Sequence, residues 1–250
     1  ITPMNPAHEV RFIRICEEII TMNPRPAFVV IMGDLITNGK LEEYQAFRKV
    51  IKRLDQTGVP WYIVMGNHDR RQIVFQAFPE KKSEVPEVPG KQILNLETPK
   101  IRFLFFDSRM DDSRAWMAEK DKYPNRRPWD GTMDDKSRKY LTDELIRSDK
   151  PTVVGTHHEP ESTHLTQIMK QYPCAKLYIY GHTHQYRSHK VDGITVLSCP
   201  SLADNRPSET DPIGYIIMTV EKNDLILTLQ TLDKKDSRNG IKTTISLNNK

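Results

Sequence analysis

Four short apolar runs in the sequence end in the same manner, each leading directly into polar residues that can act as ligands. The runs VVIM, YIVM, TVVGT and LYIY lead into GD, GNHD, HH and GHTH, at residues 33–34, 66–69, 157–158 and 181–184. Short runs of this kind, rich in β-branched residues, are typical of buried strands. Ligands in α/β folds gather outside the carboxyl ends of strands, so we expect these four segments to converge on one site.

Helical and strand patterns alternate in the first third of the chain. Residues 9–22 and 41–54 carry apolar side chains at helical spacing, while residues 27–32 and 59–65 have the pattern of buried strands. Alternation of this kind with short connections predicts βαβ units and a parallel sheet.

Strand patterns dominate after residue 90. The runs KQILNLE and IRFLFF, separated by TPK, predict a hairpin. A helix is predicted over 162–171 and strands are predicted between 190 and 232. The tail from 233 is expected either to hold one more strand or to be partly mobile. The whole pattern favours an α/β domain over 1–250, with two sheets and helices outside them. The polar segment 108–132 is interpreted as a long excursion, either a lid, an oligomer contact or a plain surface loop.

Composition limits the class of function. The 250 residues fit one large domain, and the net charge of +4 tolerates an anionic substrate without predicting nucleic-acid binding. The three cysteines lie far apart, so we expect reduced thiols and neither a disulfide framework nor a cysteine zinc site. No apolar stretch reaches the ~18 residues of a membrane span, and no signal peptide is visible. We therefore expect a cytoplasmic protein without a membrane segment.

Histidines are concentrated at the predicted strand ends. Five of the eight lie there, namely His68, His157, His158, His182 and His184. The other three, His8, His164 and His189, are expected to be ordinary surface or capping residues in helices or loops. Mixed Asp, Asn and His donors suit Mn, Fe or Zn. A satisfied polar loop would explain any one of these clusters, but four in succession favour a metal site.

The segments GDLITNG, GNHD, THHEP and GHTH, in this order, resemble the calcineurin-like metallophosphoesterase family. Within that family the chain is most similar to the class III cyclic nucleotide phosphodiesterases, and FFDS, GTMDDKSRKYLTDEL and VDGITVLSCPSLAD extend the resemblance over roughly residues 10 to 230. The resemblance implies a four-layer αββα sandwich of two mixed sheets flanked by helices. It also implies a centre of two divalent or trivalent ions.

The resemblance assigns a role to each motif residue. Asp34 would bridge both ions, Asn67, His157 and His182 would complete the second ion, and His184 would bind the first. His68 would protonate the leaving oxygen and Asp69 would orient the His68 ring. Asn38 is assigned to the substrate. His158 is placed either near the substrate or among the residues that support the ligands, although packing against Glu159 and Pro160 explains His158 equally well.

The implied activity is metal-dependent hydrolysis of small phosphodiesters, with 3',5'-cyclic nucleotides as the first candidates. A hydroxide that bridges the ions would attack in line with the leaving group. Phosphomonoesters and nucleotide pyrophosphates are alternative substrates for the same centre. A non-catalytic scaffold with a degraded metal site and a small-ligand binding module are alternatives from other classes. A homodimer formed through 108–132 and the C-terminal strands is a further expectation.

One family motif, an Asp-x-His after the first strand, is absent from the chain. The first predicted helix begins within about ten residues of Ile1, so we expect the motif and its strand to lie just before the given sequence. The first ion then has only Asp34 and His184 as ligands in this chain. Binding of that ion is therefore expected to be weak.

Overall fold

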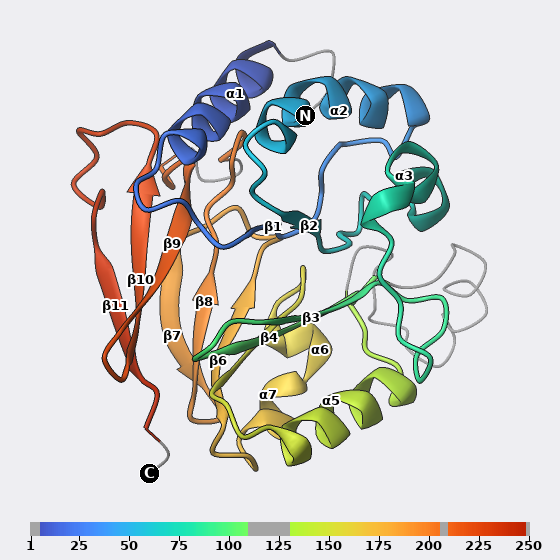
Figure 1. Ribbon diagram of the computed structural model, residues 1–250, viewed down its shortest axis with the longest axis vertical. Coiled ribbons are helices and arrows are strands. Elements are labelled where there is room, and N and C mark those ends of the chain that lie inside the picture. The colour runs from blue at the N-terminus through green and yellow to red at the C-terminus, as the bar shows by residue number, and fades with distance from the viewer. Residues whose placement is uncertain (1–5, 110–130, 206–209, 249–250) are drawn as a thin grey trace.

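The computed structural model describes residues 6–109, 131–205 and 210–248 (Figure 1). The central part of the predicted excursion 108–132 lies outside the described residues. The elements are α1 (Pro6–Ile20), β1 (Val29–Ile31), α2 (Leu41–Asp55), β2 (Trp61–Ile63), α3 (Arg71–Ala77), the 3-10 helix η1 (Pro79–Lys81), β3 (Ile93–Glu97), β4 (Arg102–Phe106), α5 (Asp135–Arg147), β5 (Thr152–Gly155), α6 (Pro160–Thr163), α7 (Leu165–Met169), β6 (Ala175–Tyr180), β7 (Arg187–Val191), β8 (Ile194–Ser198), β9 (Gly214–Glu221), β10 (Asp224–Thr231) and β11 (Lys242–Ser246).

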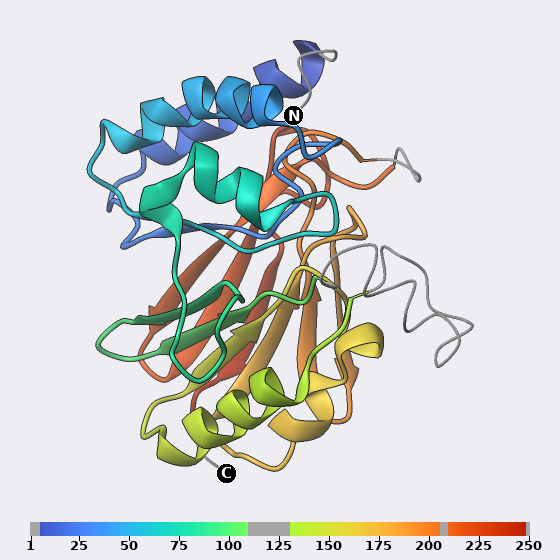
Figure 2. The ribbon, with the colours of Figure 1, turned by 90° about the vertical axis from the view of Figure 1, so that its right-hand side faces the viewer.

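Two layers of sheet lie between two layers of helix, which confirms the predicted αββα sandwich. One layer is a six-stranded mixed sheet in the order β3-β4-β5-β6-β8-β7, in which β4, β5, β6 and β8 are parallel. The other layer contains the parallel pair β1-β2 and the antiparallel sheet β11-β10-β9. Figure 2 shows α1, α2 and α3 at one end of the molecule and α5 and α7 at the other, with the strands between them.

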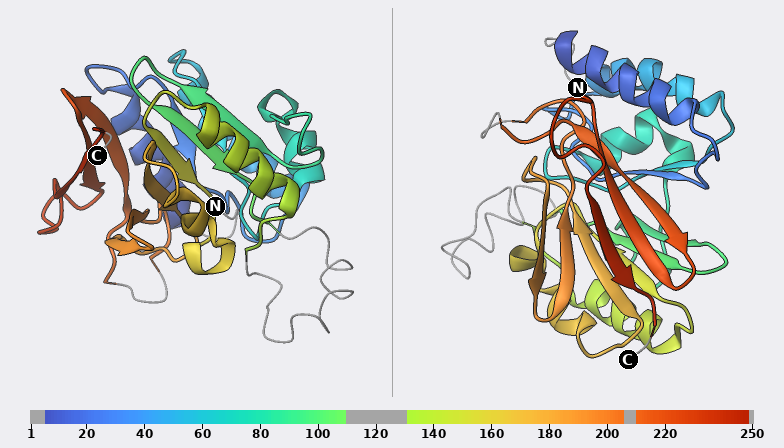
Figure 3. Two further views of the ribbon diagram at one scale, coloured as in Figure 1. Left: turned by 90° about the horizontal axis from the view of Figure 1, so that it is seen from below. Right: turned by 90° about the vertical axis from the view of Figure 1, so that its left-hand side faces the viewer.

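Three apolar clusters hold these layers together. The first packs α1 and α2 on β1 and β2, and includes Phe12, Tyr44, Phe47 and Trp61. The second packs α5 and α7 on the outer face of the six-stranded sheet. The third lies between the two sheet layers, where β9–β11 lie over the six-stranded sheet (Figure 3). The apolar periodicity of 41–54 correctly predicts the buried face of α2, because that face is the one that contacts the strands.

The second sheet layer is divided into two pieces in the described part of the chain. β1 pairs with β2, and β9 pairs with β10, but no pairing joins β1 to β9 within the described ranges. An apolar cavity of about 410 Å³ is lined by residues of both strands, including Val29–Met32 and Gly214–Val220, and by residues of α1. The predicted mixed second sheet is therefore present as a parallel pair and an antiparallel sheet.

Several element boundaries differ from the predictions. The helix predicted over 162–171 is two short helices, because His164 adopts a left-handed conformation with φ 54° and caps α6. His189 lies exposed in strand β7 and not in a helix or loop. The additional strand predicted in the tail after 233 is β11. The predicted hairpin is confirmed as the antiparallel pair β3-β4.

Candidate metal centre

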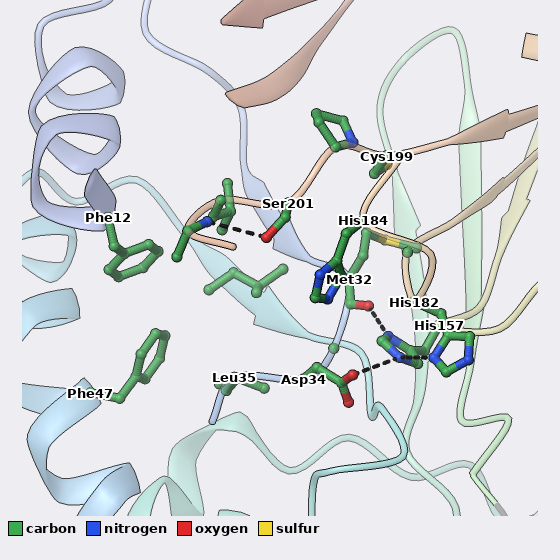
Figure 4. Close-up of a pocket in the computed structure, with 16 residues that line it drawn as sticks. Phe12, Met32, Asp34, Leu35, Phe47, His157, His182, His184, Cys199 and Ser201 are labelled. Atoms are coloured by element: carbon green, nitrogen blue, oxygen red, sulfur yellow. Dashed lines mark hydrogen bonds and ion pairs between the residues drawn. The ribbon is translucent and has the colours of Figure 1, made fainter. Parts of the chain in front are cut away.

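The four strand-end segments converge, as their pattern predicts. Asp34 follows β1, Asn67 and His68 follow β2, His157 follows β5, and His182 and His184 follow β6. The strands β1 and β2 are parallel neighbours in one layer, and β5 and β6 are parallel neighbours in the other. The site therefore forms where the carboxyl ends of strands from both layers meet (Figure 4).

His157 is at the centre of the candidate site. Its Nε2 lies 3.1 Å from Asn67 Oδ1, 3.2 Å from Asp34 Oδ2 and 3.2 Å from His182 Nδ1. Its other nitrogen, Nδ1, lies 2.6 Å from the carbonyl oxygen of Met32. A carbonyl can only accept, so Nδ1 carries the proton, and in the neutral ring Nε2 presents a lone pair.

The donor set fits a metal cation. His157 Nε2 lies 3.1–3.2 Å from two oxygens and one ring nitrogen, all able to offer lone pairs, an arrangement that is repulsive unless a proton or a metal cation lies among them. Metal–ligand distances of about 2.0–2.2 Å place neighbouring ligand atoms roughly 3 Å apart. The bond from His157 Nδ1 to a backbone carbonyl is the usual support for a ligating histidine. Asp34, Asn67, His157 and His182 could together hold one ion.

The surroundings of the site shift the pKa values of three candidate ligands. Burial alone would raise the pKa of Asp34, but the neighbouring His157 and His68 hold it below its usual range. Burial alone would lower the pKa of His157, but the Asp34 carboxylate and the Met32 carbonyl raise it above its usual value. Burial and the adjacent His157 lower the pKa of His182, which keeps this ring neutral and able to coordinate.

The backbone is unusual at three of these positions. Asp34, His182 and His184 adopt positive φ angles of 54°, 63° and 56°, respectively. Left-handed backbone at residues other than glycine costs about 1–3 kcal/mol each and persists only where the surroundings enforce it. Gly66 lies so close to Asp34 that any Cβ at Gly66 would overlap the Asp34 carboxylate and backbone nitrogen. Close packing of these loops therefore holds the side chains in place.

His184 lies apart from the other candidate ligands. In Figure 4 its ring lies above Asp34, whereas His157 and His182 lie to the right of the Asp34 carboxylate. Its Nδ1 is buried, and among the residues that the structure describes it has no hydrogen-bond partner. A cavity of about 110 Å³ is lined by Asp34, His182, His184 and Ser201, among others. The first ion of the expected pair could bind between Asp34 and His184, but these are its only two predicted ligands in the described residues.

The sequence matches the family model of the calcineurin-like phosphoesterases over residues 8–186. The chain belongs to this family. The resemblance of its four motifs to that family is thereby confirmed.

Individual relatives are distant. A probable cyclic nucleotide phosphodiesterase of Psychrobacter is 22% identical over 74% of this chain and 54% of its own length. A glycerophosphodiester phosphodiesterase of Enterobacter lignolyticus is 24% identical over 74% of this chain and 66% of its own length. The chain thus spans about half to two thirds of these relatives. A dimetal phosphatase from Danio rerio shares the fold, with a TM-score of 0.75, 15% identity and coverage of 96% of this chain and 89% of that one.

The predicted contact between Asp69 and the His68 ring is not present. The exposed His68 ring instead donates from Nδ1 to the carbonyl of Thr37, at 2.6 Å. The buried Asp69 carboxylate accepts hydrogen bonds from the backbone nitrogens of Asp34 and Gly66, at 2.8 and 2.9 Å. Asp69 points inward under the loops, whereas His68 points outward, so the two adjacent side chains cannot meet.

Asn38 and His158 occupy different surroundings. Asn38 is exposed beside the His68 loop, and its Nδ2 donates to Glu43 Oε1 at 2.8 Å, which fixes the orientation of the amide. The His158 ring is only 1% exposed and its Nδ1 lies 2.8 Å from Ser108 Oγ. One nitrogen each of His157, His158 and His182 lies within 4.8 Å of the other two. His158 therefore lies buried beside the candidate ion position.

Four supporting groups were not predicted from the sequence. They are the carbonyls of Met32 and Thr37, the Ser108 hydroxyl and the Tyr44 hydroxyl, which donates to Asp69 Oδ1 at 3.0 Å. The two carbonyls leave no trace in the sequence, because every residue has one. The available signal for Ser108 was its position two residues after strand β4, at the end of the FFDS segment. No helix of the described chain is long and apolar enough to cross a membrane.

Proposed function

We propose that the protein is a metal-dependent phosphodiesterase acting on small phosphodiesters at a centre of two ions. The observation that carries this proposal is the set of lone-pair donors around His157 Nε2, which a bound metal cation would stabilise. When bound, two such ions supply Lewis acidity toward a phosphoryl group and activate water at neutral pH. The donor types favour Mn, Fe or Zn.

The protein groups would divide the work among themselves. Asp34, Asn67, His157 and His182 would hold the second ion, and Asp34 and His184 the first. His68 would donate a proton to the leaving oxygen, because its Nδ1 is committed to Thr37 and its exposed position leaves the other side of the ring facing solvent and substrate. The Asp34 carboxylate also accepts from the His68 backbone nitrogen at 2.9 Å, which ties the acid to the metal site.

Small phosphodiesters are the favoured substrate class. The names of the relatives support both cyclic nucleotides and glycerophosphodiesters as candidates. The net charge of +4 is too small and too dispersed to favour nucleic acid. A non-catalytic scaffold is disfavoured, because a degraded site would not be expected to retain converging donors from four separate segments.

Hydrolysis by the full-length protein tests this proposal. We expect Mn²⁺-dependent cleavage of bis(p-nitrophenyl) phosphate and, in a panel, of cyclic AMP, cyclic GMP or glycerophosphodiesters in preference to p-nitrophenyl phosphate. His157→Asn should lower the rate by more than about 100-fold, since loss of even an indirect ligand contact costs 10–100-fold in affinity. His189→Asn, at an exposed position in β7, is the matched control. Metal-loaded protein that cleaves none of these esters would reject the proposal.

A further inference from the structure

We propose that Tyr44 and Asp69 form a positioning pair that fixes Asp34 in its ligating conformation. Neither residue of the pair touches the candidate ion position in the manner of a ligand, so both would act through Asp34. The inference rests on the proposed function, because it assigns Asp34 to the metal centre. It adds Tyr44, a residue of α2 outside every motif, to the machinery of the site.

Asp69 joins the two loops that carry Asp34 and Asn67. Its Oδ2 accepts from the backbone nitrogen of Asp34 at 2.8 Å and from that of Gly66 at 2.9 Å. Its side chain is completely buried, so water does not compete for these bonds. One carboxylate oxygen thus holds the loop after β1 against the loop after β2.

Tyr44 fixes the other oxygen of the same carboxylate. The Tyr44 hydroxyl lies 3.0 Å from Asp69 Oδ1, and it accepts from the backbone nitrogen of Arg70 at 3.2 Å. The Arg70 nitrogen is a donor, so the hydroxyl proton is left for Asp69. Tyr44 has no exposed surface, and α2 is packed on β1 and β2 through the same apolar face. The helix therefore sets the direction of the Asp69 carboxylate.

Asp34 needs this support because of its backbone conformation. Its φ of 54° is costly for an L-residue, and its backbone nitrogen is held in that conformation by Asp69. The position of Asp34 Oδ2 next to His157 Nε2 depends on this conformation. Loss of the Tyr44 hydroxyl would leave one carboxylate oxygen of Asp69 and the Arg70 nitrogen without this partner, and would free Asp69 to rotate.

Metal affinity of the Tyr44→Phe variant tests the inference. Metal-free protein is titrated with Mn²⁺ by calorimetry, and we expect the dissociation constant of the tighter ion to rise roughly tenfold, as for a lost hydrogen bond to a charged group. Tyr140→Phe is the matched control, because this tyrosine of α5 is also buried and its hydroxyl contacts Asn95 at 3.4 Å in another part of the fold. The control should bind Mn²⁺ like the unmodified protein.

Three further measurements separate positioning from loss of stability. Thermal unfolding in EDTA reports the structural cost of each variant, and only Tyr44→Phe should combine that cost with weaker metal binding. Asp69→Asn keeps the shape of the side chain but loses its charge, and it should also weaken Mn²⁺ binding. This variant tests the pair even if Tyr44→Phe fails to fold. In a double-mutant cycle, the rise in the Mn²⁺ dissociation constant of the double variant should be smaller than the product of the rises in the two single variants, because both substitutions remove one shared interaction.

The outcomes also distinguish this inference from the proposed function. If the unmodified protein binds no Mn²⁺, Fe²⁺ or Zn²⁺, the proposed function fails. If the unmodified protein binds metal and both Tyr44→Phe and Asp69→Asn bind it equally well, the metal centre stands and the positioning pair is rejected.

Discussion

Substitution of Gly33 by alanine tests how tightly the loops of the metal centre are packed. Gly33 has φ +91° and immediately precedes Asp34. A Cβ at this position would lie 2.5 Å from His157 Nδ1 and 2.7 Å from the backbone nitrogen of Gly66. Neither neighbour is the flexible end of a side chain. His157 Nδ1 is bonded to the Met32 carbonyl, and the Gly66 nitrogen is bonded to Asp69.

The cost of Gly33→Ala has two unfavourable parts and one favourable part. Left-handed backbone costs an L-residue roughly 1–2 kcal/mol. Forcing a methyl group into a filled space costs about 1–3 kcal/mol more. The lower flexibility of the unfolded chain returns about 0.4–1 kcal/mol. We therefore expect the free energy of unfolding to fall by about 3 kcal/mol, which lowers the Tm of a chain of this size by roughly 6–12 °C.

Gly58→Ala is the control for this experiment. Gly58 also has a positive φ, +71°, but a Cβ there would meet no atom within 4 Å. It carries the backbone cost without the crowding, so we expect a loss of only about 1 kcal/mol. Urea unfolding of the metal-free proteins, followed by circular dichroism, measures both values. Mn²⁺ titration should show weaker binding only for Gly33→Ala. Equal destabilisation by the two substitutions would refute the packing argument.

Three further predictions concern the ions and their surroundings. Calorimetric titration of the 1–250 chain with Mn²⁺ should show one ion bound at least about tenfold more tightly than any second. Loss of a group that merely supports a ligand weakens metal binding about 10–100-fold, so a site that lacks a ligand should be weakened at least as much. Equal affinities would contradict this. His182→Asn should abolish the tighter ion and His184→Asn only the weaker one, and the reverse result would exchange the two assignments. Ser108→Ala should reduce the free energy of unfolding by about 1–2 kcal/mol in urea, since Ser108 is fully buried against His158. Ser188→Ala, exposed on β7, should have no measurable effect.

The sequence predicts the convergence of the site well, because the relevant signal is local. A polar group directly after a buried strand is visible in a few residues, and the parallel arrangement of strands then determines where such groups meet. Asp34, His157 and His182 are brought together in this manner, since Asp34 Oδ2 and His182 Nδ1 each lie 3.2 Å from His157 Nε2. The burial of Tyr44 is likewise predicted from helical spacing alone.

The partners of those residues could not be predicted, because they depend on how segments far apart in the sequence pack. Helical spacing assigns Tyr44 to the apolar face of α2 but does not show that its hydroxyl meets Asp69, 25 residues later. The orientation of His68 comes from the carbonyl of Thr37, and a carbonyl has no sequence signature. The assignment of Asp69 to His68 followed the usual carboxylate–histidine pairing and was wrong, since burial turned the carboxylate toward backbone nitrogens.

The residues of the candidate metal centre are held in place by one kind of contact within the layer of β1 and β2 and by another kind between the two sheet layers. Within the layer of β1 and β2, hydrogen bonds donated to the Asp69 carboxylate by Tyr44 and by backbone nitrogens of both loops join α2 to these loops, and these bonds need no ion. Between the layers, the lone pairs of candidate ligands lie close to His157 Nε2, and the hydrogen bond from His157 Nδ1 to the Met32 carbonyl is a direct link that needs no ion. A bound cation would attract the lone pairs of the candidate ligands from both layers, which otherwise repel one another. The ion should therefore stabilise the contact between the two sheet layers, while the conformation of Asp34 is already set in its absence.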